Sequence, residues 1–435
     1  MNNSTINRNI LRLALPSIMA NITVPLVGIV DLAIAGRLGD AASIGGIAIG
    51  SMLFDLLYWN MGFLRVGTGG ITAQAFGRSD FKEAMDTFTR GIVTALAVAL
   101  LIWIIQWVYI EAAFALVVCS PEVESIAREY FFIRVWAAPA TLSLMVFKGW
   151  FIGMQNTVLP MAVDITVNVL NVVISYILAV HTPMGVAGVA AGTVVAQYGG
   201  LLLAIILMHS NFRKYFHLIS VRASIKLNQM KRFFSINGNL FIRSLCMLVI
   251  YIGFTSIAAK YGDTLLAVSS VMMKLLLLYS YFVDGFAYAG EALVGRFIGE
   301  RNSDSLISTV RRIFIWCFGI SIASTLIYAG LGKPMFRLMT DNPAVVEAST
   351  PFLFWLLLMP VVSCIAFTWD GIFIGATATH HLRNSMIWSA ALFVVTYIVF
   401  EPLLGIQSLY LAYFVHLLVR SLYLTIVRKG ALTVK

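Results

Sequence analysis

Long apolar runs, separated by short polar or charged segments, fill almost the whole chain. A helix needs about twenty apolar residues to cross the hydrocarbon core of a bilayer. Twelve runs of this kind predict twelve membrane-spanning helices, at residues 10–36, 44–76, 88–112, 121–153, 159–180, 185–209, 231–259, 265–298, 306–331, 345–376, 383–402 and 406–427. No run shows the alternation over about ten residues that a transmembrane β-barrel strand requires, so the pattern predicts an all-α membrane protein.

The composition supports the same class of protein. Of the 435 residues, 60% are hydrophobic and 11% are charged, and the mean hydropathy is +0.89. Ordinary soluble domains carry about 25% charged residues, so a soluble globular protein is excluded. The net charge of +10 does not indicate nucleic-acid binding, because the basic residues cluster in the loops between the apolar runs.

The distribution of Lys and Arg predicts how the chain lies in the bilayer. An even number of spans places both termini on the same side. The loops on that side carry most of the basic residues, namely Arg8, Arg12, Arg78, Lys82, Arg90, the segment 209–232, Arg296, Arg301, Arg311, Arg312, Arg383, Arg428 and Lys429. We therefore expect both termini in the cytoplasm. The first apolar run is too long for the core of a cleavable signal, so we expect it to remain as the first span.

The second half of the chain repeats the first. The matching segments are GFLRVG at Gly62 with GFAYAG at Gly285 (285 − 62 = 223), GWFIG at Gly149 with GIFIG at Gly371 (371 − 149 = 222), and residues 37–40 with residues 260–263 (260 − 37 = 223). Three matches at nearly one offset indicate an internal duplication of six spans. Because six is even, both copies have the same orientation in the membrane, which supports alternating access around a central cavity.

A basic connector at residues 211–230 divides the two repeats. We therefore expect an N-terminal six-helix lobe at residues 1–210 and a C-terminal six-helix lobe at residues 231–435. A basic cytoplasmic loop most often lies on anionic lipid, so membrane lipids are the partner that we expect for the connector.

No motif for enzymatic chemistry is present. The sequence holds no Walker loop, nucleophile elbow or HExxH helix, so neither ATP hydrolysis nor proteolysis is indicated. The four cysteines lie far apart without metal-binding or redox spacing, and we expect the adjacent His380 and His381 to be solvated rather than bound to a metal. We expect no enzyme activity and no cofactor or bound metal; the energy source that remains is an ion gradient.

One acid stands out within the first span. The stretch from Leu13 to Gly36 holds a single charged residue, Asp31. A carboxylate inside a span costs roughly 3 kcal/mol and by default marks a functional site. Pro25 and Gly28 precede it and predict a hinge, where the helix bends or loosens beside the acid. The alternative is that Asp31 only pairs with a Lys or Arg of a neighbouring helix.

A polar stripe runs along the fifth span. Asp164, Asn168, Asn171 and Ser175 are spaced four, three and four residues apart, so they lie on one face of a helix. These side chains are candidates for the lining of a substrate cavity. The alternative is hydrogen bonding between helices, which contributes under about 1 kcal/mol per bond.

Further ionisable and aromatic residues lie in the eighth and tenth spans. Asp284, Glu291, Tyr288 and Asp370 are the candidates there for a substrate cavity. Carboxylates near aromatic rings can hold an organic cation, with about 0.5 to 2 kcal/mol from each ring. The alternatives are pairing of the acids with nearby basic residues and core packing of the rings.

The sequence resembles the multidrug and toxic compound extrusion (MATE) transporters, and within them the DinF branch. The segments that carry the resemblance are RLALPSIMANITVPLVGIVDLAIAGRLG, FLRVGTGGITAQAFG, GWFIGMQNTVLP, the NVLN of the fifth span, DGFAYAGEA and WDGIFIGA. The resemblance implies twelve helices in two six-helix lobes that form a V. It also implies a monomer in the inner membrane of a prokaryote that exports toxic, mostly cationic amphipathic drugs, driven by protons or sodium.

The resemblance also implies a cation-coupling site in the first lobe. The family's Asp, Asn, second acid and Thr correspond here to Asp31, Asn171, Ser175 and Thr193, with Ser175 in place of the usual Asp. A sodium ion needs several oxygens and carboxylate charge. With Asp31 as the only acid of the set, we expect the coupling ion to be a proton, and sodium stays as the alternative.

These observations predict a secondary active multidrug exporter that works by antiport. A flippase or an exporter of lipid-linked or anionic amphipathic substrates is the alternative, because Arg65, Lys148 and Lys274 place positive charge inside the spans. A passive channel is an alternative of another class.

Overall fold

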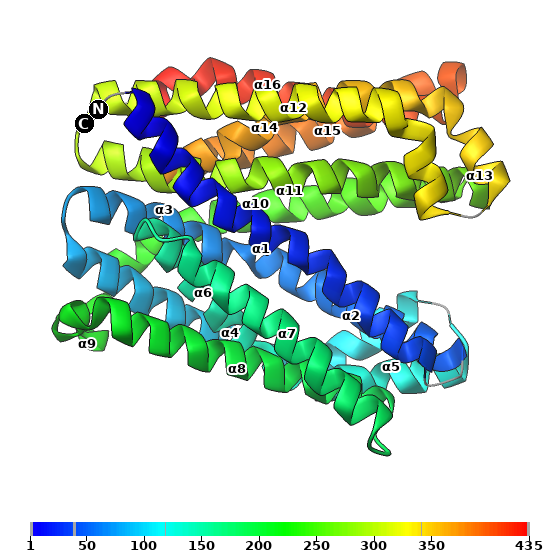
Figure 1. The fold of residues 1–435 in the computed structure, drawn as a ribbon, viewed down its shortest axis with the longest axis horizontal. Coiled ribbons are helices and arrows are strands. Elements are labelled where there is room, and N and C mark those ends of the chain that lie inside the picture. Colours follow the sequence, from blue (N-terminus) through cyan, green and yellow to red (C-terminus); the bar gives the residue numbers. More distant parts are fainter. Residues whose placement is uncertain (1–2, 38–40, 118, 341, 433–435) are drawn as a thin grey trace. The chain divides into compact units, whose positions relative to one another are not determined.

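The computed structural model describes residues 3–37, 41–117, 119–340 and 342–432, and these residues form helices and turns without strands (Figure 1). The α-helices are α1 (Asn3–Arg37), α2 (Ala41–Trp59), α3 (Phe63–Gly77), α4 (Phe81–Leu116), α5 (Pro121–Arg134), α6 (Ala138–Gly153), α7 (Val158–Val180), α8 (Val186–Phe212), α9 (Val221–Ser224), α10 (Leu227–Ala259), α11 (Asp263–Gly299), α12 (Ser303–Met339), α13 (Pro343–Ala348), α14 (Leu353–Gly375), α15 (Thr379–Leu404) and α16 (Gln407–Ala431). Within the described residues, twelve segments are long and apolar enough to cross a membrane. They coincide with the twelve predicted spans, so the prediction of an all-α membrane protein is confirmed.

Three spans are interrupted by a short 3₁₀ turn. The turns are Asn60–Gly62 between α2 and α3, Val135–Ala137 between α5 and α6, and Thr350–Phe352 between α13 and α14. A 3₁₀ turn in the middle of a span changes the helix direction and often lies near a functional position. The hydropathy pattern predicts the span as one run and does not detect these turns.

The described chain divides into two compact units. The N-terminal unit is Met19–Phe234, and the C-terminal unit is Ser235–Lys435 together with Met1–Ile18. The division differs from the lobes expected from the sequence at α1, whose first half groups with the C-terminal helices. The contact of Gly285 with the side chain of Ile18 and the carbonyl of Ala14 shows why, because a Cβ at Gly285 would overlap both.

The internal repeat is visible in the helix packing. A Cβ on Gly149 would overlap the backbone carbonyl of Arg65, and a Cβ on Gly371 would overlap that of Ala287. The second contact repeats the first at a constant offset along the chain: the two glycines are 222 residues apart (371 − 149 = 222), and so are their two partners (287 − 65 = 222). The glycines of GWFIG and GIFIG therefore allow the same close packing, of α6 on α3 and of α14 on α11. Residues 38–40, which belong to another predicted repeat match, lie outside the described residues.

The turns that end the helices repeat as well. Among the residues that the structure describes, four other than glycine have positive φ, namely Ser79 (57°), Gln155 (64°), Arg301 (56°) and Thr377 (54°). They form two pairs at the same offset, since 301 − 79 = 222 and 377 − 155 = 222. Left-handed residues end helices by satisfying the last carbonyl groups. The duplication therefore preserves backbone conformation at positions where the side chains have changed.

Candidate functional site

Asp31 lies on α1 and is 9% exposed. Its Oδ1 atom is buried and has no hydrogen-bond partner among the described residues. The guanidinium group of Arg134 interacts electrostatically with the carboxylates of both Asp31 and Asp55. Asp31 and Arg134 form no direct ion pair in the described part of the chain. The charge of Asp31 is thus partly compensated without being fixed in a salt bridge.

Arg134 is held in place by groups other than Asp31. It is the last residue of α5, and its Nη1 donates to the hydroxyl of Tyr130 at 2.9 Å and to that of Ser51 at 3.4 Å. Its guanidinium group lies 4.9 Å from the centre of the Phe54 ring, a cation–π distance. Tyr130 and Phe54 are fully buried and belong to the aromatic core between α2 and α5. Two helices therefore fix this cation before any ion or substrate arrives.

Arg134 was missed in the sequence-based prediction of the site. The available signal was the second of two arginines inside the predicted span 121–153, four residues after a tyrosine. Such a residue should have been counted with the other charges inside spans. Its proximity to Asp31 depends on how α1 and α5 pack, and no local pattern encodes that.

The other three residues of the predicted coupling set form one hydrogen-bonded chain. Asn171 donates through Nδ2 to the hydroxyl of Thr193 at 2.8 Å, and Thr193 donates to the carbonyl of Val189 at 3.1 Å. The same carbonyl accepts from the Ser175 hydroxyl at 3.2 Å. The buried Oδ1 of Asn171 has no partner in the described chain. This chain ties α7 to α8 and leaves one amide oxygen as an available acceptor.

Close helix packing accounts for the small residue at position 175. A Cβ on Gly192 would overlap the hydroxyl of Ser175 and would lie 2.5 Å from its backbone nitrogen. Further along, a Cβ on Gly188 would lie 2.7 Å from the backbone nitrogen of Ala179. The two helices thus meet backbone to backbone at Ser175. A carboxylate at this position would require α7 and α8 to separate.

The remainder of the predicted stripe on α7 makes contacts between helices. Asn168 donates to the Thr23 hydroxyl on α1 at 2.7 Å. Asp164 forms an ion pair with Lys148 of α6, which balances its charge. Within the described residues, no hydrogen bond joins Asp31 to Asn171, Ser175 or Thr193. The structure therefore places the predicted set in two groups, the acid beside Arg134 and the chain between α7 and α8.

The predicted hinge lies in an unbroken helix. α1 continues through both Pro25 and Gly28. Proline has no backbone N–H, so the helix lacks one hydrogen bond there. A Cβ on Gly28 would meet no atom within 4 Å, so space is open on that side of α1.

The C-terminal unit holds a second charged group. Asp370 of α14 accepts through Oδ2 from Arg243 of α10 at 2.5 Å and from Arg420 of α16 at 2.6 Å. The side chain of Arg420 is only 1% exposed. The Oδ1 of Asp370 and the Nε of both arginines are buried without hydrogen-bond partners. His416, one turn before Arg420, is also buried. Asp370, which was predicted to line a cavity, therefore places one negative charge against the positive charges of two arginines.

The remaining predicted residues of this unit lie on α11. Glu291 is fully buried, and Asp284 and Tyr288 are half-buried. Gly375 packs against the backbone of Glu291, because a Cβ there would lie 2.5 Å from its carbonyl oxygen. Lys274 on the same helix is exposed. These residues are placed by the same helix that carries the repeated packing contact at Ala287.

A duplicated bundle of twelve apolar helices with few buried charges is the architecture of a secondary transporter. A model of the MatE family matches residues 16–177 and 240–403, once in each repeat. DNA damage-inducible protein F of Escherichia coli is 33% identical over 416 residues, which cover 95% of this chain and 90% of that protein. The chain belongs to the MatE family of membrane transporters.

A more distant relative is similar over most of the chain, and a solved structure shares its fold. A probable multidrug resistance protein NorM of Neisseria meningitidis serogroup B is 23% identical over 364 residues, covering 81% of this chain and 79% of that protein. The crystal structure of the Vibrio cholerae MATE transporter VcmN in its bent form has a TM-score of 0.87 at 15% identity and covers 99% of this chain and 98% of that chain. The chain is a multi-pass protein of the inner membrane and a transporter rather than an enzyme.

Proposed function

We propose that this protein is a proton-coupled antiporter that exports amphipathic, mainly cationic, organic compounds from the cytoplasm. The single observation that carries the proposal is the buried Asp31 carboxylate, with one oxygen unpartnered and a cation, Arg134, nearby but not bound to it. A carboxyl group in this setting can bind and lose one proton per cycle. The relatives named as multidrug resistance proteins support small organic molecules as the substrate class.

The surrounding groups favour a proton over sodium. A sodium site requires several oxygens and negative charge. The hydroxyls of Ser175 and Thr193 both donate to the carbonyl of Val189, and Asp164 is neutralised by Lys148. These arrangements leave Asp31 as the one acid of the set that is available for the coupling ion.

The proposed cycle depends on the charge around Arg134. Ionised Asp31 balances the arginine, and an organic cation is tolerated nearby. When Asp31 takes a proton from outside, Arg134 stays positive, and the cation is repelled and released. α1, weakened at Pro25, adjusts its path as the charge changes. Loss of the proton toward the cytoplasm restores the first state, and both termini face that compartment in this proposal.

Substitution of the coupling acid tests this proposal. Asp31→Asn removes the charge and keeps the shape, so efflux of a cationic dye from vesicles with an imposed proton gradient should fall to the level of empty vesicles. The matched control is Glu122→Gln, which changes an exposed acid at the start of α5. Gradient-driven efflux by the Asp31→Asn protein, or efflux by the unaltered protein under a sodium gradient alone, would overturn the proposal.

A second candidate is export of anionic amphipathic or lipid-linked compounds. The observation that favours it is the pair of arginines on Asp370, because two guanidinium groups carry many more N–H donors than one carboxylate oxygen accepts. An anionic head group would satisfy the surplus. Of the three basic residues that suggested this alternative from the sequence, Arg65, Lys148 and Lys274, Lys148 forms an ion pair with Asp164.

A further inference from the structure

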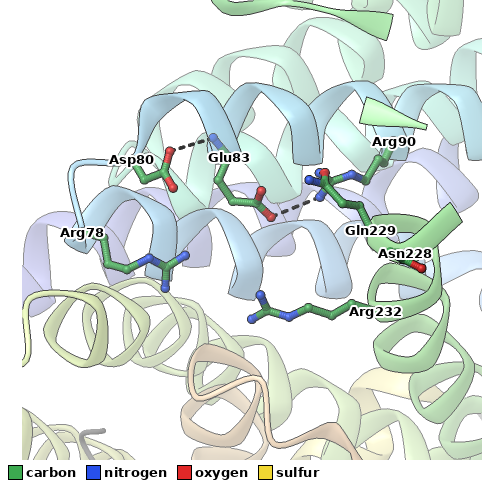
Figure 2. A pocket seen from close by; sticks show the side chains of 7 residues that line it. All are labelled: Arg78, Asp80, Glu83, Arg90, Asn228, Gln229 and Arg232. Atoms are coloured by element: carbon green, nitrogen blue, oxygen red, sulfur yellow. Dashed lines mark hydrogen bonds and ion pairs between the residues drawn. The ribbon is translucent and has the colours of Figure 1, made fainter. Parts of the chain in front are cut away.

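A cavity of about 300 Å³ lies in the N-terminal unit, apart from the site described above (Figure 2). It is formed where α3 ends and where α4 and α10 begin. Its lining residues are Arg78, Asp80, Glu83, Arg90, Asn228, Gln229 and Arg232. All of these side chains are polar or charged, and three of them are arginines. The cavity therefore lies at the ends of three spans, on the side of the chain that is rich in basic residues.

The two acids of the cavity are occupied by partners of their own. Asp80 is the N-cap of α4, and its Oδ1 accepts from the backbone N–H of Glu83 at 3.0 Å. Glu83 accepts through Oε1 from the Nη1 of Arg90 at 3.1 Å. Figure 2 shows both interactions on one wall of the cavity. Neither acid neutralises the other two arginines.

Arg90 is a buried structural group that helps to build the wall of the cavity. Its side chain is only 3% exposed. It donates through Nε to the carbonyl of Ser224 at 2.9 Å and also to the side chain of Gln229. Ser224 in turn donates to Oδ1 of Asp86 at 2.8 Å. These bonds fix α9 and the start of α10 against α4, so the cavity has a defined shape.

Arg78 and Arg232 are the two charges left over. Their side chains make no hydrogen bond or ion pair with any residue that the structure describes. Figure 2 shows their guanidinium groups extending toward the same space, one from the turn after α3 and the other from α10. The turn is held by Ser79 in a left-handed conformation, with φ at 57°. Two separate elements thus direct uncompensated positive charge into one cavity.

We propose that this cavity binds the phosphate group of an anionic phospholipid. Phosphate oxygens accept paired hydrogen bonds from guanidinium groups, and a charge of −1 or −2 matches Arg78 and Arg232. Basic cavities at the cytoplasmic ends of spanning helices are suited to lipid head groups. The side-chain amide of Asn228 supplies a further donor at the rim.

Exposed apolar side chains close in sequence to the lining residues of α10 favour a lipid over free phosphate. Ile219, Val221 and Ile225 precede α10 and are 40%, 53% and 44% exposed, and Phe234 in its second turn is 52% exposed. A soluble phosphate would use none of this surface, whereas an acyl chain or the bilayer interface would cover it. A bound lipid would join the turn after α3 to the start of α10 and hold the basic connector against α4.

The test uses the purified full-length protein in detergent with added phosphatidylglycerol, phosphatidylcholine or inorganic phosphate. Phosphatidylglycerol should raise the unfolding temperature of the protein and stay bound in native mass spectrometry. In the double variant Arg78→Gln, Arg232→Gln its apparent affinity should fall roughly tenfold or more, because two charged hydrogen-bonding groups are lost. Both side chains are exposed and unpartnered, so the variant is expected to fold normally without lipid.

A matched control is Arg213→Gln, which removes an exposed arginine of the connector outside the cavity. It should leave phosphatidylglycerol binding unchanged. Equal binding by the double variant and the unaltered protein would overturn the site. Stabilisation by inorganic phosphate that reproduces the lipid effect, and is lost in the double variant, would overturn the lipid assignment and make the cavity a site for soluble phosphate.

Discussion

At the scale of single residues, the proposed role of Arg134 is to determine what protonation of Asp31 does to the local charge. The arginine is anchored by Tyr130, Ser51 and the Phe54 ring. It therefore remains in place whether or not Asp31 is ionised. In the proposed cycle, protonation of Asp31 removes one of the two carboxylate charges that act on Arg134, so the local charge becomes more positive in a low-dielectric setting, where like charges repel strongly. A single proton can thus change the affinity for a cationic substrate without a metal-like ligand cage.

Replacement of Arg134 tests this coupling. Arg134→Gln keeps hydrogen-bonding capacity and removes the charge, so a bound cation is no longer repelled when Asp31 is protonated. Two unit charges about 8 Å apart at an effective dielectric constant near 20 interact by about 2 kcal/mol, and loss of an interaction of this order should lower proton-driven efflux roughly tenfold or more. Arg134→Lys should keep part of the activity.

The measurement is initial efflux rate at matched protein level in the vesicle membrane. The control is Arg128→Gln on the same helix, where the arginine pairs with Glu111 and Glu124 on an exposed face. Unchanged efflux in Arg134→Gln would show that the arginine only supports the fold.

The sequence predicted the acid of this site but not its environment. Asp31 is found from one charge in a long apolar run, and that signal is local. Arg134 approaches it from a helix one hundred residues further on, so the pair depends on tertiary packing. The change to Ser175 was visible in the sequence, yet its hydrogen bond to Val189 and its contact with Gly192 follow only from the packing of α7 on α8.

At the scale of helices, the duplication preserves packing and changes chemistry. The contact pairs at Gly149 and Gly371 are equivalent, whereas the residues just before them are Lys148 and Asp370, of opposite charge at the same repeat position (370 − 148 = 222). Lys148 pairs with Asp164, and Asp370 pairs with two arginines. The short glycine motifs therefore predicted the repeat from the sequence. They could not predict that the charged residues before the glycines pair with different groups in the two units.

The packing of α7 on α8 leads to a prediction about stability. In Gly192→Ala the added Cβ would overlap Ser175, including its backbone, so the helices must separate. Overpacking of this kind costs about 1–3 kcal/mol, and the unfolding temperature in detergent should fall, together with loss of the contact between Asn171 and Thr193. Gly319→Ala is the control, because that glycine lies in a helix with no atom within 4 Å of the added Cβ. An unfolding temperature equal to that of the control would contradict the proposed contact.

At the scale of the whole molecule, the boundaries between the two compact units fall within the first helix of each repeat. The unit boundaries fall inside α1, after Ile18, and inside α10, after Phe234. Each repeat therefore begins with residues that group with the other unit. The acid of the proposed coupling site and the basic cavity both belong to the N-terminal unit, since Asp31 lies on α1 after Ile18 and the cavity uses residues of α10 before Ser235.

The two units also differ in the charge that they would offer a substrate. Asp31 in the N-terminal unit favours a cation, whereas Arg243 and Arg420 in the C-terminal unit favour an anion. In vesicles with an imposed proton gradient, a cationic dye should be moved uphill and an anionic dye of similar size should not. Arg243→Gln should leave cation transport unchanged, because it removes charge from the other unit.

Uphill movement of the anionic dye that is lost in Arg243→Gln would instead support export of anionic amphiphiles. Downhill movement alone would indicate a passive channel. The sign of the transported charge thus decides which unit's charged group binds the substrate.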